Sequence, residues 1–273
     1  MNQETFFARL HVLLARESEY GVVIRRGPSR YTCFIGWDRQ KDSFEPAQWL
    51  KGRVYGRRSD VSPDGKHLIY FAMNGRKNSE AKGAWTAISK SPWMKAIALY
   101  AKGNCWHGGG LFLDNHSYWL NDGYGHQVIR QTNEVIRDAS YRPDKNYGCE
   151  CTGVYYIRLQ RDGWVLKNLE NTRNAVFEKI LPYGWRLQKI AHAQTNPPSG
   201  KGCYWDEHLL INPKQEIQKH PDWEWADWDD QRIVWASQGC LKACSIVSGT
   251  ELASEKILYD FNSMQFQPIK APY

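Results

Sequence analysis

The sequence contains no apolar run close to the length of a membrane-spanning helix. Runs such as AIALYA at residues 96–101 are far shorter than the ~18 residues that such a helix needs. The start of the chain also lacks the pattern of a secretory signal, because Glu4 stands where positive charge is required and Arg9 and His11 interrupt the apolar stretch. We therefore expect no membrane segment and a cytoplasmic, bacterial protein.

The cysteines do not form the pattern of a secreted disulfide framework. Their number is odd, and they are scattered along the chain at Cys33, Cys105, Cys149, Cys151, Cys203, Cys240 and Cys244. The pairs in CEC and CLKAC lack the two-residue spacing of a zinc ribbon, and no histidine lies at the matching offset. We expect structural thiols in a reducing compartment, with no metal and no cofactor.

Two motifs of common enzymes are missing as well. The glycines at 108–110 are not followed by the lysine and the serine or threonine of a phosphate-binding loop. No Gly-x-Ser-x-Gly elbow is present to carry a nucleophilic serine. The chain is instead rich in tryptophan (13) and tyrosine (15), which fill cores and form recognition faces. An enzyme is therefore the less favoured class.

Short strand-like runs dominate from residue 20 onward. Runs such as YGVVIRR, HLIYFAM, VYYIRLQ and RIVWASQ are rich in β-branched and aromatic residues and are bounded by Gly, Asp, Asn or Pro. Residues 5–16 differ, because Phe6, Leu10, Leu13 and Leu14 form the stripe of a short amphipathic helix. We predict an all-β chain, with an N-terminal helix within residues 1–19 packed on a single domain that spans 20–273.

Several segments share one layout, in which an Asp-containing turn leads into an apolar strand. The apolar centres of five such segments lie near residues 69, 119, 165, 209 and 234. The first three separations in sequence between successive centres match the length of one propeller blade, which consists of four strands and their turns. Asp-Gly at 64/65 and at 162/163 predicts tight hairpins, since both residues tolerate positive φ. We therefore predict a small β-propeller of about five blades; the alternative architecture is a β-sandwich with a smaller α+β piece.

One of these segments resembles a known repeat. VSPDGKHLIYFA at 61–72 is similar to the repeat of Tol-type propellers and their relatives with tryptophan-aspartate-like repeats, in which a Ser-Pro-Asp-Gly turn precedes the blade's apolar strand. The later segments lack the Ser-Pro. The resemblance implies a propeller fold, but not a function, because propellers host many activities.

Charge is unevenly distributed along the chain. The net charge of residues 1–100 is +8, whereas that of residues 201–273 is −4. Arg25, Arg26, Arg57 and Arg58 in the basic part would provide phosphate contacts if they formed an exposed face beside aromatic side chains. Nucleic-acid binding is therefore one alternative; the other interpretation of the basic and acidic segments is that they complement each other within the fold.

Two segments stand out as candidate sites. NCWHGGGLFLDNH at 104–116 places Trp106 and His107 beside three glycines, which permit either close packing or the close approach of a ligand. DWEWADWDD at 222–230 alternates the indoles of Trp223, Trp225 and Trp228 with carboxylates. Asp227, Asp229 or Asp230 is the weak candidate for catalysis in a carbohydrate-active hydrolase, and the indoles for stacking on a sugar in a lectin-like binder. The alternative is an acidic turn with core tryptophans.

The favoured function is recognition of another macromolecule. Tryptophan, tyrosine and arginine dominate interface energetics, and a propeller presents them on a flat face. We expect a protein partner, with carbohydrate and nucleic acid as the two alternatives.

Overall fold

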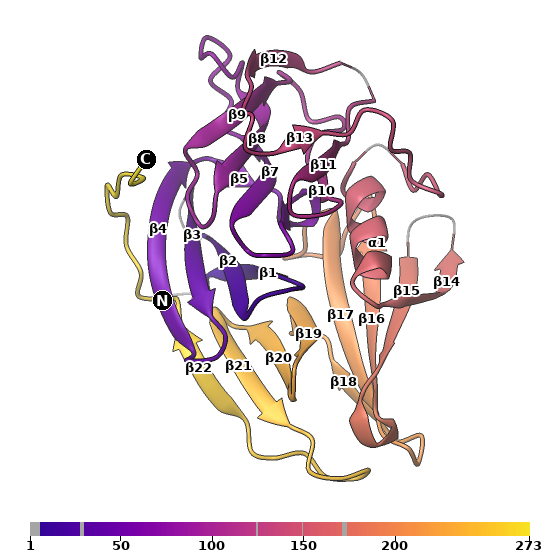
Figure 1. Cartoon of the computed structure of the whole chain (residues 1–273). Coiled ribbons are helices and arrows are strands. Elements are labelled where there is room, and N and C mark those ends of the chain that lie inside the picture. The colour runs from indigo at the N-terminus through magenta and orange to yellow at the C-terminus, as the bar shows by residue number, and fades with distance from the viewer. Residues whose placement is uncertain (1–5, 28–29, 124, 149, 171–173) are drawn as a thin grey trace. The chain divides into compact units, whose positions relative to one another are not determined.

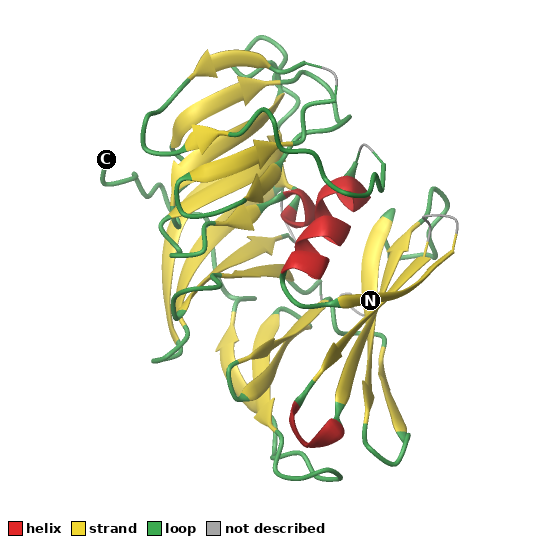
Figure 2. Cartoon of the chain, turned by 45° about the vertical axis from the view of Figure 1, so that its right-hand side comes forward, coloured by secondary structure: helices red, strands yellow, loops and turns green. Residues whose placement is uncertain are grey.

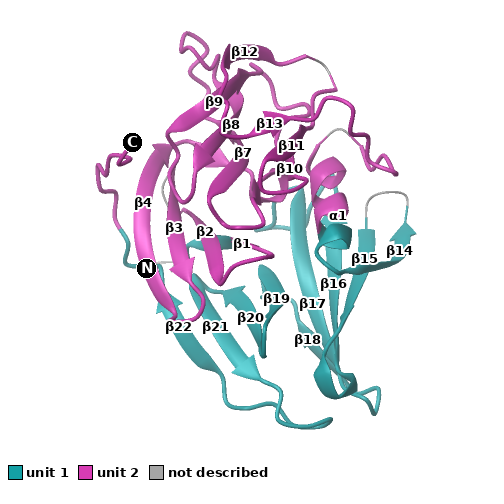
Figure 3. Cartoon of the chain, in the orientation of Figure 1, with its two compact units in different colours: residues 1–11, 159–264 teal, residues 12–158, 265–273 magenta. Residues whose placement is uncertain are grey.

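The computed structural model describes residues 6–27, 30–123, 125–148, 150–170 and 174–273. The chain divides into two compact units, shown in different colours in Figure 3. Unit 1 comprises residues 1–11 and 159–264, and unit 2 comprises residues 12–158 and 265–273. Each unit is therefore assembled from segments that are distant in sequence.

Strands make up 48% of the structure and are its main regular element, as Figure 1 and Figure 2 illustrate. They form five sheets; β11 and β13 pair in parallel, and the other pairings whose register is described are antiparallel. The only α-helix in the described part of the chain is α1 (Cys151–Arg161), in the middle of the sequence. The prediction of a mainly β chain is confirmed, but a propeller is not detected in the described residues.

Unit 2 is built around three sheets. The first has the order β1 (Arg9–Leu14, of which Val12–Leu14 belong to this unit), β2 (Tyr20–Arg26), β3 (Tyr31–Asp38) and β4 (Ser43–Lys51). The second has the order β12 (Gln127–Arg130), β9 (Ala96–Ala101), β8 (Ala84–Lys90), β7 (His67–Met73) and β5 (Arg53–Val54), with β6 (Asp60–Val61) also paired to β7. The third has the order β10 (Gly110–Phe112), β11 (Ser117–Leu120) and β13 (Ile136–Arg137).

The second sheet is buried on both faces. Successive side chains of a strand point to opposite faces, and in β7 Tyr70 packs into one apolar cluster with Phe34 of the first sheet. Its neighbour Ile69 packs into another cluster with Phe112 and Tyr118 of the third sheet. This double burial explains why β7 is almost continuously apolar rather than alternating.

Unit 1 contains the other two sheets, each a meander of successive strands. One has the order β14 (Val165–Glu170), β15 (Asn174–Ile180), β16 (Arg186–Ala193), β17 (Tyr204–Ile211) and β18 (Ile217–His220). The other has the order β19 (Trp225–Asp229), β20 (Arg232–Ser237), β21 (Cys240–Ser245) and β22 (Lys256–Asp260). Short 3₁₀ turns lie at η1 (Gly56–Arg58) and η2 (Pro182–Gly184).

The N-terminal helix prediction is wrong. Residues 9–14 form strand β1, in which Leu10, Val12 and Leu13 are buried. The apolar residues at 10, 13 and 14 match a helical stripe, but strand pairing to β2 decides the conformation. Residues 1–5 lie outside the described residues.

The aromatic run VYYIRLQ is not a strand but the body of helix α1. Its rings are held by contacts from distant residues: the Arg57 guanidinium lies 4.7 Å from the centre of the Tyr155 ring. The Tyr147 ring packs 5.4 Å from that of Tyr156. Asp162–Gly163 consequently ends this helix instead of forming a hairpin, since the N–H of Trp164 donates to the carbonyl of Leu159.

The predicted Ser-Pro-Asp-Gly turn is present between β6 and β7. The N–H of Gly65 donates to the Ser62 carbonyl, and Gly65 has a φ of 80°. The assignment of one repeat to each blade is not reproduced, however, because the centres at 165 and 209 lie in strands β14 and β17 of the same sheet.

Candidate recognition site at the glycine loop

The segment 103–110, here called the glycine loop, connects β9 of the second sheet of unit 2 to β10 of the third. His107, Gly108 and Gly109 have φ values of 57°, 88° and 75°, all in the left-handed region. For a side chain such as that of His107 this conformation is uncommon and costs free energy. The surrounding contacts therefore impose the shape of the loop.

The glycines are required by packing. A Cβ atom added to Gly108 would clash with the Phe71 ring, and one added to Gly109 would clash with the backbone oxygen of Arg58. A Cβ on Gly110 would clash with the backbone oxygen of Trp119. The triple glycine thus lets the loop lie directly against backbone, as the packing interpretation of the sequence expected.

Arg58 fixes the loop from inside unit 2. Its side chain is buried, and its Nη1 atom donates to the carbonyl oxygens of Cys105 and His107, each at 2.6 Å. Its Nη2 atom lies 3.7 Å from a carboxylate oxygen of Glu150, and the guanidinium packs 4.9 Å from the centre of the Phe71 ring. A buried guanidinium needs this set of acceptors, because an unpaired buried charge is strongly unfavourable.

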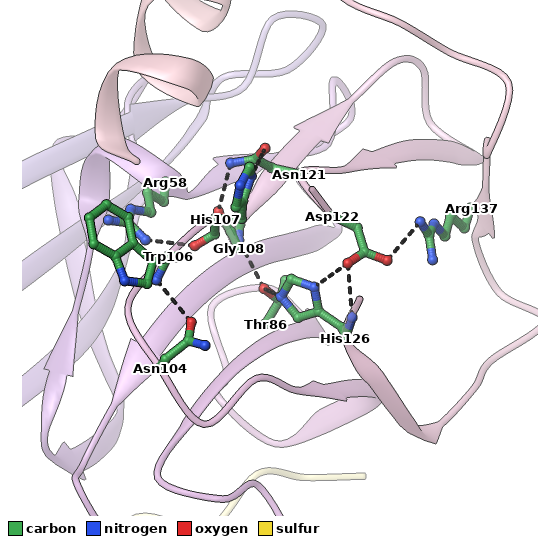
Figure 4. A network of polar contacts seen from close by, with 11 residues as sticks. Arg58, Thr86, Asn104, Trp106, His107, Gly108, Asn121, Asp122, His126 and Arg137 are labelled. Carbon is green, nitrogen blue, oxygen red and sulfur yellow. Dashed lines mark hydrogen bonds and ion pairs between the residues drawn. The ribbon is translucent and has the colours of Figure 1, made fainter. Parts of the chain in front are cut away.

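Asn121 holds the loop from the other side (Figure 4). The N–H of Gly108 donates to the Asn121 carbonyl at 2.9 Å, and the N–H of Asn121 donates to the Gly109 carbonyl at 2.9 Å. The loop backbone is therefore bonded on both sides of His107.

A second set of contacts runs from the loop through Thr86. The N–H of Gly109 donates to the Thr86 hydroxyl at 2.8 Å, and this hydroxyl lies 3.4 Å from Nε2 of His126. Nδ1 of His126 is 2.8 Å from Asp122, whose other oxygen accepts from Arg137 at 3.1 Å (Figure 4). The chain of bonds extends from the loop to strand β13.

The electrostatics of this set favour a neutral histidine facing a carboxylate. Burial lowers the pKa of His126 below its usual range, against the opposing effect of Asp122. Burial opposes ionisation of Asp122, but its hydrogen bonds from His126 and the charge of Arg137 still hold its pKa low. The hydrogen bonds link Asp122, His126 and Thr86 in the same order as the acid, base and hydroxyl nucleophile of a catalytic triad. Thr86 is fully buried, however, and its oxygen is bonded to the loop, so the arrangement suits positioning rather than attack.

Trp106 is the exposed feature of this rigid loop. Its side chain retains 53% of its accessible surface, although the carbonyls on both sides of it, those of Cys105 and His107, are bonded to Arg58. Its own N–H donates to the Asn104 side chain at 3.0 Å. A large aromatic on a fixed backbone loses little conformational entropy when it binds.

The other arginines singled out from the sequence do not form an exposed face. Arg25 and Arg57 are buried, and Arg26 is half-buried. The Arg25 guanidinium lies 5.5 Å from the centre of the Trp49 ring. Arg58 is the one arginine of the four that contacts the glycine loop through a described hydrogen bond, and there it acts as an internal support.

The described contacts of the acidic segment 222–230 are packing contacts, hydrogen bonds and ion pairs within unit 1. Trp223 and Trp225 are buried, and the Trp223 ring stacks 4.6 Å from that of Trp235. Asp227 accepts from Lys179 at 2.5 Å and from the Trp164 indole at 3.2 Å.

The remaining residues of this segment lie in or near a hairpin. Asp229 pairs with the Arg232 guanidinium at 3.0 Å. Asp230 is exposed in the turn between β19 and β20, with a φ of 53°, and Trp228 is half-buried. The carboxylates of Asp227 and Asp229 thus neutralise basic side chains of unit 1.

Neither similarity to known proteins nor a cluster of metal ligands indicates the family of this protein. No protein-family model matches the chain, and no curated protein is similar to it in sequence. Over the described residues, no three His, Cys, Asp or Glu side chains gather as metal ligands would. Cys149 lies outside the described residues. No helix in the described part of the chain is both long and apolar enough to span a membrane.

Sequence reasoning identified Trp106 and His107 but missed Thr86, Asn121, Asp122 and His126. The signal for Asn121 and Asp122 was their place directly after an apolar strand, where polar side chains often support a site. Nothing local marks Thr86, which lies within the apolar strand β8.

Proposed function

We propose that this protein is a recognition module that binds a protein partner through the glycine loop, with Trp106 as the anchor. The observation that carries the proposal is an exposed indole on a backbone whose conformation is fixed by Arg58, Thr86 and Asn121. Tryptophan is the residue most enriched among interface hot spots, and preorganisation reduces the entropic cost of binding.

The charges near the loop favour a partner with acidic groups. Lys102 is half-buried, Lys82 is exposed and close to Gly103, and the buried Arg58 adds positive potential beneath the loop. Burial lowers the pKa of His107, with Lys102 and Arg58 acting in the same direction, so its imidazole is neutral at pH 7. We expect the partner to offer an apolar pocket for the indole with acidic side chains at the rim.

The finer fold prediction also remains a proposal. Five sheets, of which the second in unit 2 packs against a sheet on each face, fit a small propeller of about five blades. An experimental structure that places the five sheets around one axis would support it, and two stacked layers would contradict it.

The function is tested with the full chain as bait in extracts of its host. Candidate partners retained by the wild type are purified, and their affinity is measured for Trp106→Ala and for Ile136→Ala. Ile136, in β13, is a matched control because it is an exposed apolar residue outside the glycine loop. Trp106→Ala should weaken binding at least ~10-fold, as expected for a hot spot, and Ile136→Ala less than ~2-fold.

Two results would overturn the proposal. One is an unchanged affinity in Trp106→Ala. The other is capture that disappears on nuclease treatment, or that depends on a glycan, because either would identify a different class of ligand.

A further inference from the structure

The segment 265–273, here called the strap, follows unit 1 in sequence but belongs to unit 2 (Figure 3). It has no regular secondary structure, and in Figure 1 it runs past strand β4. Pro268 and Pro272 remove two backbone donors and favour an extended conformation. Side chains at its two ends provide its described contacts with the rest of unit 2.

The first anchor is Phe266. Its ring centre lies 4.9 Å from that of Tyr31 on β3 and 6.2 Å from that of Trp49 on β4. Phe266 nevertheless remains 49% exposed. The ring therefore rests on an aromatic surface rather than being enclosed in a core.

The second anchor is Tyr273. Its hydroxyl donates to the carbonyl of Lys95 at 2.6 Å and accepts from the N–H of Lys90 at 3.1 Å. The ammonium groups of the same two lysines lie 5.0 Å and 5.5 Å from the centre of its ring. Backbone and side chains thus recognise both the hydroxyl and the ring of a tyrosine.

This second position is built independently of the strap. The Gln48 side chain on β4 accepts from the N–H groups of Met94 and Lys95, both at 2.9 Å. The Tyr70 hydroxyl donates to the Met94 carbonyl. The loop that binds Tyr273 is therefore held in place by the sheets beneath it.

The strap leaves one donor of this surface unused. The indole nitrogen of Trp49 is buried, and no described residue offers it a hydrogen-bond acceptor. A buried N–H without an acceptor is unfavourable. A partner segment that offered an acceptor to this N–H would gain a hydrogen bond that the strap does not provide.

We propose that the surface formed by Tyr31, Gln48, Trp49, Lys90 and Lys95, here called the strap surface, is a docking site for an extended segment of a partner protein. The partner segment has the chemistry of the strap: an aromatic side chain, prolines and then a tyrosine. The strap covers this surface in cis and is displaced when the partner segment binds. This site is separate from the glycine loop and does not depend on it.

The test uses a fluorescent peptide with the sequence of residues 265–273 and the full chain. In the double variant Phe266→Ala/Tyr273→Ala the chain's own strap lacks both anchors, so the strap surface is accessible. The peptide should bind this variant at least ~10-fold more tightly than it binds the wild type, measured by fluorescence anisotropy. Adding Lys90→Ala and Lys95→Ala should weaken that binding, and Trp106→Ala should leave it unchanged.

A peptide with alanine in place of its phenylalanine and tyrosine is the matched control and should not bind. Equal binding of the peptide to variant and wild type, or equal binding of the two peptides, would overturn the proposal. Hydrogen exchange in Tyr273→Phe provides a second measurement that does not require removal of both rings. The Lys90 amide should lose protection in this variant and regain it with saturating peptide; no recovery would also overturn the proposal.

Discussion

The buried Arg58 shows how a charged residue can fix the backbone of a surface loop from the interior. Its guanidinium donates to two carbonyls of the glycine loop, and this fixes the backbone around Trp106. In water those donors would be satisfied by solvent, so the buried guanidinium is stable only with its acceptors in place. The exposed indole and the buried arginine therefore act as one unit.

Gly109 is the glycine for which substitution by alanine should be most damaging in this loop. The added Cβ would clash with the Arg58 backbone oxygen, and the φ of 75° disfavours any side chain. We predict that Gly109→Ala lowers the free energy of unfolding by at least about 2 kcal/mol, as measured by urea denaturation.

Gly75→Ala is the matched control for that prediction. Gly75 has a similar φ of 72°, but no atom lies near its added Cβ. It should cost only the conformational penalty, about 1 kcal/mol. Equal losses in the two variants would show that packing against Arg58 does not matter.

The residues of the site were only partly predictable. Trp106 and His107 could be singled out because a run of glycines beside an aromatic is locally unusual. The role of Arg58 could not, since the carbonyls that it binds are 47 and 49 residues away in sequence. The sequence does not reveal whether the side chains of the adjacent residues Arg57 and Arg58 face solvent or the interior.

At the scale of elements, strand prediction worked where burial and local preference agree. YGVVIRR and HLIYFAM correspond to β2 and β7 with the predicted bounds. VYYIRLQ failed because aromatic and β-branched residues favour strands on average, whereas packing of Tyr155 and Tyr156 here favours a helix. Element type was therefore least predictable where contacts from distant residues decide it.

Strand β17 carries a buried histidine that should make stability depend on pH. His208 donates through Nδ1 to the Trp223 carbonyl at 3.0 Å, and its Nε2 atom is buried with no described partner. Burial, followed by the charge of Lys189, lowers its pKa well below the usual value, while Asp206 acts in the opposite direction and His220 adds a smaller lowering effect. The folded state thus holds this imidazole neutral.

The sign of the pH effect follows from the number of bound protons. An unfolded histidine has a pKa of about 6.5, so below that pH the unfolded chain binds more protons than the folded chain at this position. Stability should therefore fall as the pH is lowered from 7.5 to 5.5. This histidine should contribute a slope of up to about 1.4 kcal/mol per pH unit.

Urea denaturation across that pH range tests this expectation. The unfolding free energy of His208→Gln should depend less on pH than that of the wild type, whatever its absolute stability. His116→Gln, at an exposed position, is the control and should retain the wild-type slope. A His208→Gln slope equal to that of the wild type would refute the role assigned to this histidine.

At the scale of the whole molecule, the mainly β class could be predicted from the sequence, but the boundaries of the sheets could not. Of the two predicted Asp-Gly hairpins, the one at 64/65 is present between β6 and β7, whereas the one at 162/163 ends helix α1. The segments centred near 165 and 209 fall within one sheet because similar turns also connect strands inside a sheet. A turn motif alone does not mark where one sheet ends.

The net charge of +7 suggests nucleic-acid binding, but the placement of the arginines argues against a specific groove. Arg25, Arg57 and Arg58 are buried, so their guanidinium groups are not accessible to phosphates. We predict that binding to single-stranded and duplex probes is weak, with a slope of log affinity against log salt shallower than about −2. A slope typical of six or more phosphate contacts would contradict this prediction.

The central claim is that the whole chain recognises a protein partner through Trp106. The most direct measurement places a photoreactive phenylalanine derivative at position 106 or, as control, at position 136 of the full chain in its native host. Irradiation should yield one discrete protein adduct from position 106 that is absent from position 136. Identical products from both positions, or adducts to nucleic acid alone, would contradict the account.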